Sequence, residues 1–176
     1  MKLNRLVFLT IFFLAACSGK ESIDQPKHFF DLRGYFDKEA KRLQLENPII
    51  QKTVSQNTDS EEKQLRLNDW KTELELFAES DINKPAWKDS YRIIQKGLVT
   101  QYLAKDPDLK TRKILIRMSD KTTISQISIV NKSDNALYSS IEQLDYFPDS
   151  LYSIQKKQNV RVIGENFYAV SARLKN

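Results

Sequence analysis

Few side chains in this 176-residue chain have the type and spacing that catalysis or metal binding requires. Cys17 is the only cysteine and His28 the only histidine, so zinc sites built from His and Cys are excluded. Asp106 and Asp108 flank Pro107, a pattern typical of a turn, and no Gly-rich phosphate loop or dinucleotide fingerprint is present. We therefore expect a protein that is not an enzyme and that holds no metal and no cofactor.

Cys17 stands at the end of an apolar run behind a short positive leader. Lys2 and Arg5 precede residues 6–16, which are apolar except for Thr10, and this is the layout of an export signal. At a rise of about 1.5 Å per residue, the run covers only about half of a roughly 30 Å hydrocarbon core. It is too short for a stable transmembrane helix, so we interpret it as a removable signal peptide.

Leu14-Ala15-Ala16-Cys17 resembles the lipobox of bacterial lipoproteins, in which the cysteine thiol receives a diacylglycerol and the signal is cut just before it. The resemblance implies acyl chains such as palmitate on Cys17, and two or three such chains make attachment effectively permanent. Ser18 follows where an aspartate commonly signals inner-membrane retention, so the resemblance implies the outer membrane, with the domain facing the periplasm. The alternative, an uncleaved helix, would leave a lone thiol in an exported chain.

The predicted organisation is a signal peptide at residues 1–16, a lipidated cysteine and flexible tether at residues 17–27, and a single domain over residues 28–176. The tether would hold the domain up to about 35 Å from the lipid. Removal of the signal leaves 26 Lys and Arg against 23 Asp and Glu, a net charge of +3. This excess is small and interspersed, so we expect no nucleic-acid partner.

Two segments have the apolar spacing of amphipathic helices. The first runs from Phe29 to Asn47-Pro48, and the second begins after Asn68 or Asp69 and stops at residues 81–85. A hairpin is expected between them, at residues 49–55 and 63–67. Short alternating runs follow at residues 91–95, 98–104, 113–118, 124–130, 137–147, 151–155 and 167–174. The order predicts an α+β fold in which two N-terminal amphipathic helices pack on a curled antiparallel β-meander of about six to eight strands.

Aromatic residues with helical or strand spacing form a candidate groove for a ligand or partner. A tryptophan offers a large apolar area with a polar N–H, but such residues more often seal a core, and both interpretations stay open. The candidates are Phe36, Trp70, Phe77, Trp87, Tyr91 and Tyr102.

Basic residues gather near the C-terminus as a candidate surface for anionic head groups or another acidic surface. The alternative is a solvated strand edge, which lysines often protect against aggregation. The five residues are Lys156, Lys157, Arg161, Arg173 and Lys175, with Glu165 among them.

The segment "LAACSGK", followed by helices and a β-meander, is similar to small lipoproteins of the Bacteroidota, a likeness that carries no known activity to this chain. We expect a non-enzymatic envelope lipoprotein that binds a partner protein or scaffolds an outer-membrane assembly. The alternative is a carrier or receptor for an apolar ligand or lipid in a cavity between sheet and helices. An enzyme that uses a pair of carboxylates is a third possibility.

Overall fold

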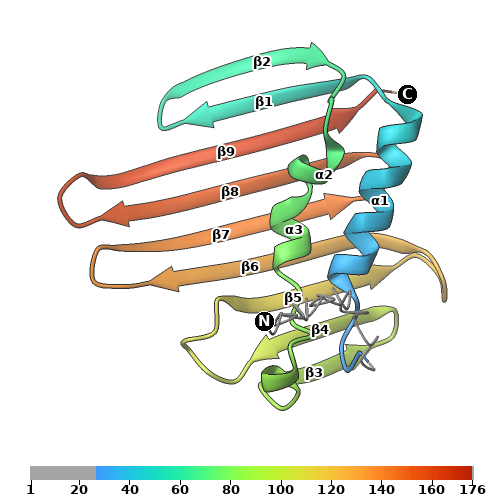
Figure 1. Ribbon diagram of the computed structural model, residues 1–176, viewed down its shortest axis with the longest axis vertical. Helices are drawn as coiled ribbons and strands as arrows, with labels where there is room; N and C mark the ends of the chain where they lie inside the picture. Colours follow the sequence, from blue (N-terminus) through green and yellow to red (C-terminus); the bar gives the residue numbers. More distant parts are fainter. Residues whose placement is uncertain (1–26, 176) are drawn as a thin grey trace, which may run out of the picture.

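The computed structural model describes residues 27–175 and is built around one nine-stranded antiparallel sheet (Figure 1). The strand order is β2-β1-β9-β8-β7-β6-β5-β4-β3. The helical segments are α1 (Leu32–Glu46), α2 (Trp70–Glu73), α3 (Glu75–Glu79) and a 3₁₀ turn, η1 (Pro85–Trp87). The strands are β1 (Ile50–Gln56), β2 (Asp59–Leu65), β3 (Tyr91–Lys96), β4 (Val99–Ala104), β5 (Thr111–Met118), β6 (Ile124–Asp134), β7 (Tyr138–Phe147), β8 (Leu151–Val160) and β9 (Gly164–Leu174).

Strands β3 to β9 form an up-and-down meander, and the β1–β2 hairpin extends it beyond β9. β1 pairs with β9 in a continuous register from Ile50 opposite Leu174 to Gln56 opposite Tyr168. The turn of this hairpin is tied to β9 as well, because the Asn57 N–H donates to the carbonyl of Phe167 at 2.8 Å. The first and last described strands, β1 and β9, therefore lie side by side within one sheet.

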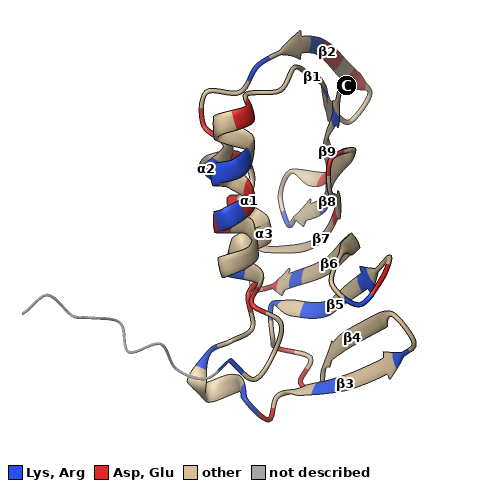
Figure 2. Ribbon diagram, turned by 90° about the vertical axis from the view of Figure 1, so that its right-hand side faces the viewer, with Lys and Arg blue, Asp and Glu red and all other residues tan. Residues whose placement is uncertain are grey.

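The helices cover only one face of the sheet (Figure 2). In the part of the chain that the structure describes, no element lies on the other face, which we call the open face. Alternate residues of each strand point toward the helices, and their apolar members are buried there against α1, α2 and α3. Fully buried members of this core include Leu32, Phe36, Leu43, Ile50, Trp70, Phe77, Ile82, Ile127, Ile129, Leu144, Tyr152 and Ala172.

Two tyrosine–glutamate pairs attach the helices to the middle of the sheet. Tyr146 on β7 lies directly opposite Tyr152 on β8, and both point toward the helices. The Tyr146 hydroxyl donates to Glu39 of α1, and the Tyr152 hydroxyl donates to Glu73 of α2. One cross-strand pair of side chains thus positions both helical segments.

Each of these glutamates also has a cation beside it. Arg42 donates to Glu39 from Nε at 3.1 Å, and Lys52 of β1 lies 2.6 Å from Glu73. Arg42 also reaches Asp149 in the β7–β8 turn, with 2.7 Å between Nη2 and Oδ1. Burial alone would raise the pKa of Glu39, but the hydrogen bonds from Arg42 and Tyr146 outweigh it and hold that pKa below its ordinary value.

The predicted α+β arrangement of two helices on a six- to eight-stranded meander is wrong. Only 18% of the described structure is helical, and α1 is the only described helix of seven or more residues. The second predicted helix divides because Leu74 leaves the helical backbone conformation (φ −96°, ψ 5°), which apolar spacing does not reveal. The predicted hairpin is present as β1 and β2, and its pairing with β9 makes it part of the nine-stranded sheet.

We predict that Tyr146→Phe lowers the free energy of unfolding by about 2 kcal/mol, because the variant loses a buried hydrogen bond to a charged acceptor. Urea denaturation measures this loss. Tyr138→Phe is the matched control, since Tyr138 lies on the same strand and its hydroxyl has no hydrogen bond within residues 27–175. Equal losses in the two variants would show that the bond to Glu39 does not stabilise the attachment of α1.

Candidate functional site

Five of the six aromatic residues of the predicted groove are buried in the core, and Trp87 packs against it, in two separate clusters. Three of them belong to the helices and are buried against the sheet: Phe36 of α1 and Phe77 of α3 have ring centroids 4.9 Å apart, and Trp70 of α2 contacts Tyr152. All three are at most 1% exposed. Their rings pack against one another and against the sheet, and none of them lines any of the clefts described below.

The other three predicted residues lie at the β3–β4 end of the sheet. Phe29 packs edge to face between Tyr91 and Tyr102, at centroid distances of 5.6 and 5.7 Å. Trp87 packs against Tyr91 on its solvent side. The Lys84 ammonium lies 4.1 Å from the centroid of the Trp87 ring. Burial raises the pKa of Tyr91 to about 12, with a small opposing effect of Arg112. This cluster closes the lower end of the core.

The predicted basic surface near the C-terminus is divided between the two ends of the sheet. Lys156, Lys157 and Arg161 lie toward the β8–β9 turn, whereas Arg173 and Lys175 follow at the far end of β9. Lys156 pairs with Glu142 at 3.2 Å, and Lys157 pairs with Glu165 at 3.1 Å. The five side chains therefore do not form one patch.

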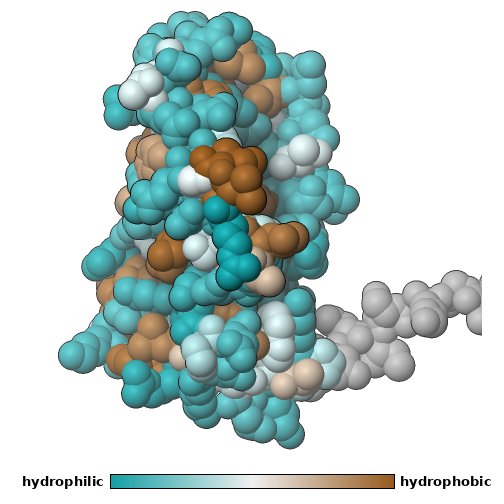
Figure 3. All heavy atoms as spheres, turned by 90° about the vertical axis from the view of Figure 1, so that its left-hand side faces the viewer, coloured by the Kyte–Doolittle hydropathy of each residue, from teal (hydrophilic) through white to brown (hydrophobic). Residues whose placement is uncertain are grey.

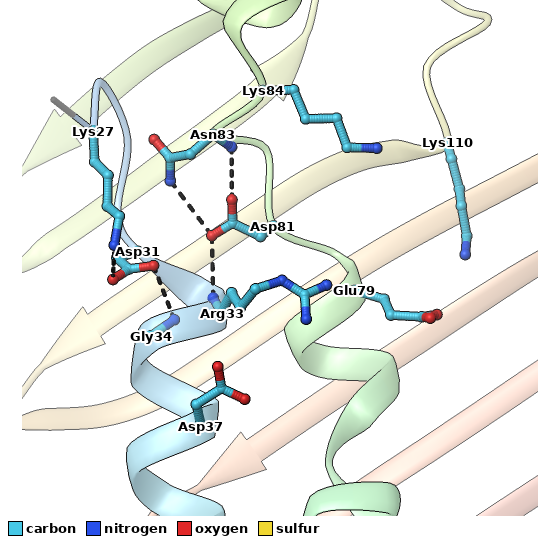
Figure 4. A pocket seen from close by; sticks show the side chains of 10 residues that line it. All are labelled: Lys27, Asp31, Arg33, Gly34, Asp37, Glu79, Asp81, Asn83, Lys84 and Lys110. Carbon is cyan, nitrogen blue, oxygen red and sulfur yellow. Dashed lines mark hydrogen bonds and ion pairs between the residues drawn. The ribbon is translucent and has the colours of Figure 1, made fainter. Parts of the chain in front are cut away.

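A cleft of about 650 Å³ lies between the start of α1 and the segment after α3 (Figure 4). Asp81 and Asn83 hold this seam together: Asp81 accepts from the Arg33 N–H, and Asn83 accepts from the Phe29 N–H. Burial would raise the pKa of Asp31, but hydrogen bonds from Lys27 and the Gly34 N–H lower it below its ordinary value. Four acidic and four basic residues line the cleft: Asp31, Asp37, Glu79 and Asp81, with Lys27, Arg33, Lys84 and Lys110.

A basic and apolar array covers the open face at β3, β4 and β5. Register places nine side chains there in three rows of three, with Gln101 at the centre, opposite Ile94 on one side and Leu115 on the other. Four cations stand at the corners of the array and four apolar side chains stand between them. The rows are Arg92–Leu103–Lys113, Ile94–Gln101–Leu115 and Lys96–Val99–Arg117. We call these nine residues the basic patch.

None of the corner cations of the basic patch has an acidic residue directly opposite it in the strand register. Within residues 27–175 none of them forms an ion pair, and only Arg117 donates to another side chain, that of Gln126 at 3.3 Å. Neighbouring corners are about 10 Å apart across the strands and about 13 Å apart along them. Figure 2 shows basic residues along β3 and β5. The patch therefore presents four positive charges around half-buried apolar side chains.

Sequence reasoning missed the basic patch, although part of its signal is visible in the sequence. In "YRIIQK" the cations Arg92 and Lys96 share one parity, as do Lys113 and Arg117 in "KILIRM". Parity shows that each pair points to the same face of its strand. Only the cross-strand register brings the two pairs to opposite edges of one array.

Three further observations concern the rest of the chain and its comparison with known proteins. Cys17 and the predicted signal peptide lie outside the described residues. Within residues 27–175 no cluster of His, Cys, Asp and Glu side chains is suited to a metal ion, and no helix has the length and hydropathy to cross a bilayer. Searches against protein-family models, curated proteins and solved structures found no match to this chain.

We predict that Phe77→Ala costs about 4 kcal/mol of unfolding free energy, because it empties a closed core position. Phe167→Ala is the matched control, since Phe167 is 41% exposed on the open face, and we expect it to cost less than about 1 kcal/mol. Urea denaturation of both variants compares the two sites. A cost for Phe77→Ala as small as the control would indicate an open groove instead of a packed core.

Proposed function

We propose that this chain is a lipoprotein anchored through Cys17 in the bacterial outer membrane, and that it binds an acidic partner protein instead of catalysing a reaction. The basic patch carries this proposal. In the proposed complex the partner covers the open face over β3, β4 and β5 from the periplasmic side.

The chemistry of the basic patch fits a protein surface with separated carboxylates. Corner cations about 10 to 13 Å apart match several single acidic side chains better than one compact anion. Burial of the apolar side chains between them contributes favourable binding free energy, and Gln101 can form hydrogen bonds at the centre. Opposite charges at the rim speed association and exclude basic competitors.

The alternative of a carrier for an apolar ligand has less support. A carrier needs apolar side chains that line a cavity, but the six aromatic residues contact one another and neighbouring core residues. The large cleft between α1 and the segment after α3 is lined by charged groups, which do not favour an apolar ligand. We therefore favour a function performed at the surface of the sheet.

We predict that a photo-crosslinking amino acid at Gln101 captures one protein of constant mass in cells that produce the full chain. Lys113→Glu with Arg117→Glu should abolish that adduct, because two of the four attractive corners become repulsive. The same crosslinker at Lys41, on the exposed side of α1, is the positional control and should give no such adduct.

The matched charge control for this experiment is Lys41→Glu with Lys71→Glu, which makes the same change of charge on α1 and α2. These variants should retain the Gln101 adduct. Loss of the adduct in both double variants would indicate attraction by net charge alone. Absence of any adduct at Gln101 would contradict partner binding at the basic patch.

We also predict that the full chain, produced in a Gram-negative host, is labelled by an alkyne analogue of palmitate and sediments with the outer membrane. Cys17→Ser should remove the label, because the thioether to the lipid requires a thiol. Ser18→Asp should keep the label and move the protein to the inner membrane. A labelled Cys17→Ser variant would contradict attachment at this residue.

A further inference from the structure

The ends of β6, β7, β8 and β9 project beyond the layer of helices. In Figure 1 these four strands extend to the left of α2 and α3, where their two turns lie next to each other. The turns are connected, since the Arg161 N–H donates to the carbonyl of Leu137 at 3.1 Å. We call the two turns, residues 135–137 and 161–163, the hairpin tip.

Exposed apolar side chains concentrate at this projecting end. Of the ten large hydrophobic side chains that are exposed within the described residues, seven lie on these strand ends or on the adjoining end of β1. Figure 3, which views this end of the sheet, shows apolar groups among hydrophilic ones. The seven are Val54, Leu137, Ile141, Val162, Ile163, Phe167 and Tyr168.

The turn residues are the most exposed of this group. Val162 is 95% exposed, Ile163 is 76% exposed and Leu137 is 73% exposed. Tight turns normally carry Gly, Asn, Asp or Ser, and a consecutive Val-Ile pair at a turn adds nothing to the core. Their exposure requires a reason outside the fold of this chain.

Arg161 adds a positive charge to the apolar turn residues. Lys157 beside it is paired with Glu165, but Arg161 forms no ion pair within the described part of the chain. Arg161 and Asp134 both line a shallow cleft of about 170 Å³, and Asp134 lies 3.7 Å from Lys132 instead. The hairpin tip thus combines exposed apolar side chains with one cation that forms no ion pair within the described residues.

We propose that the hairpin tip inserts into the interfacial region of an anionic lipid bilayer. Apolar side chains exposed at a projecting strand end suit a fluid layer, in which acyl chains surround Val162, Ile163 and Leu137. Arg161 then lies at the level of the lipid phosphates, as charged residues beside interfacial apolar segments do. This inference goes beyond the proposed binding of an acidic protein and does not depend on it.

The test uses a chain that begins at Ser18 and therefore has no lipid of its own. Every side chain of the described core lies between Phe29 and Leu174, so this chain keeps the whole core. It should sediment with vesicles of phosphatidylethanolamine and phosphatidylglycerol. Val162→Asn with Ile163→Asn should lower the affinity at least tenfold, because both side chains leave water only in the bound state.

Arg161→Gln should lower the affinity for the anionic vesicles about fivefold, the effect of one basic residue at such a surface, and leave binding to phosphatidylcholine unchanged. Leu45→Asn is the matched apolar control, since Leu45 is 88% exposed at the end of α1, and it should bind like the unaltered chain. Val162→Trp should show a blue shift of its fluorescence when vesicles are added.

Three results would overturn this proposal. The first is failure of the unaltered chain to bind either kind of vesicle. This includes the case in which the tip binds a second copy of the chain instead, and Val162→Asn with Ile163→Asn abolishes that self-association. The second is unchanged affinity of that double variant. The third is binding that only Lys113→Glu with Arg117→Glu removes, which would assign the lipid contact to the basic patch. Thermal unfolding of each variant verifies that the fold is retained.

Discussion

The structure depends on the cross-strand pair Tyr146 and Tyr152. Since one face of the sheet is open, the core forms only on the other face, and these two side chains attach the helices there. Each hydroxyl reaches a glutamate on a different helical segment, Glu39 or Glu73, and each glutamate also has a cation beside it. A buried carboxylate without such partners would be costly, so the four groups stabilise one arrangement of helices over β7 and β8. The apolar side chains around them then supply most of the favourable free energy of burial.

This arrangement leaves part of the sheet without cover. The strands β6 to β9 have 10 or 11 residues, which corresponds to about 35 Å. Two helical segments side by side cover only about 20 Å. The remaining length projects as the strand ends that carry Ile141, Phe167 and Tyr168, and the open face is exposed over its whole extent. The hairpin tip therefore follows from a helical layer that is narrower than its sheet, and the basic patch follows from a sheet that the described helices cover on one face only.

Local pattern in the sequence located strands, but it did not reveal the fold class. All seven alternating runs predicted after Trp87 overlap the observed strands β3 to β9. The nine-stranded sheet depends on Ile50 pairing with Leu174, a contact between the two ends of the domain that no local period contains. The same limit applies to the sites. The charges near the C-terminus predicted one basic surface that included both Arg161 and Arg173, but β9 separates these residues, which lie toward opposite ends of the strands. The basic patch needs register, which the hairpin turn at Gly97 sets with its positive φ of 55°.

The two proposed contacts are compatible with one orientation of the protein on the membrane. If the hairpin tip enters the bilayer, strands β6 to β9 stand steeply on it, because the tip is formed by the turns at their ends. The open face then points sideways, and a periplasmic partner can approach the basic patch without displacing lipid. The ten Cα–Cα steps from Cys17 to Lys27 reach at most about 35 Å, close to the length of one of these strands. The proposed lipid anchor and the hairpin tip can therefore occupy the same leaflet while the basic patch stays accessible.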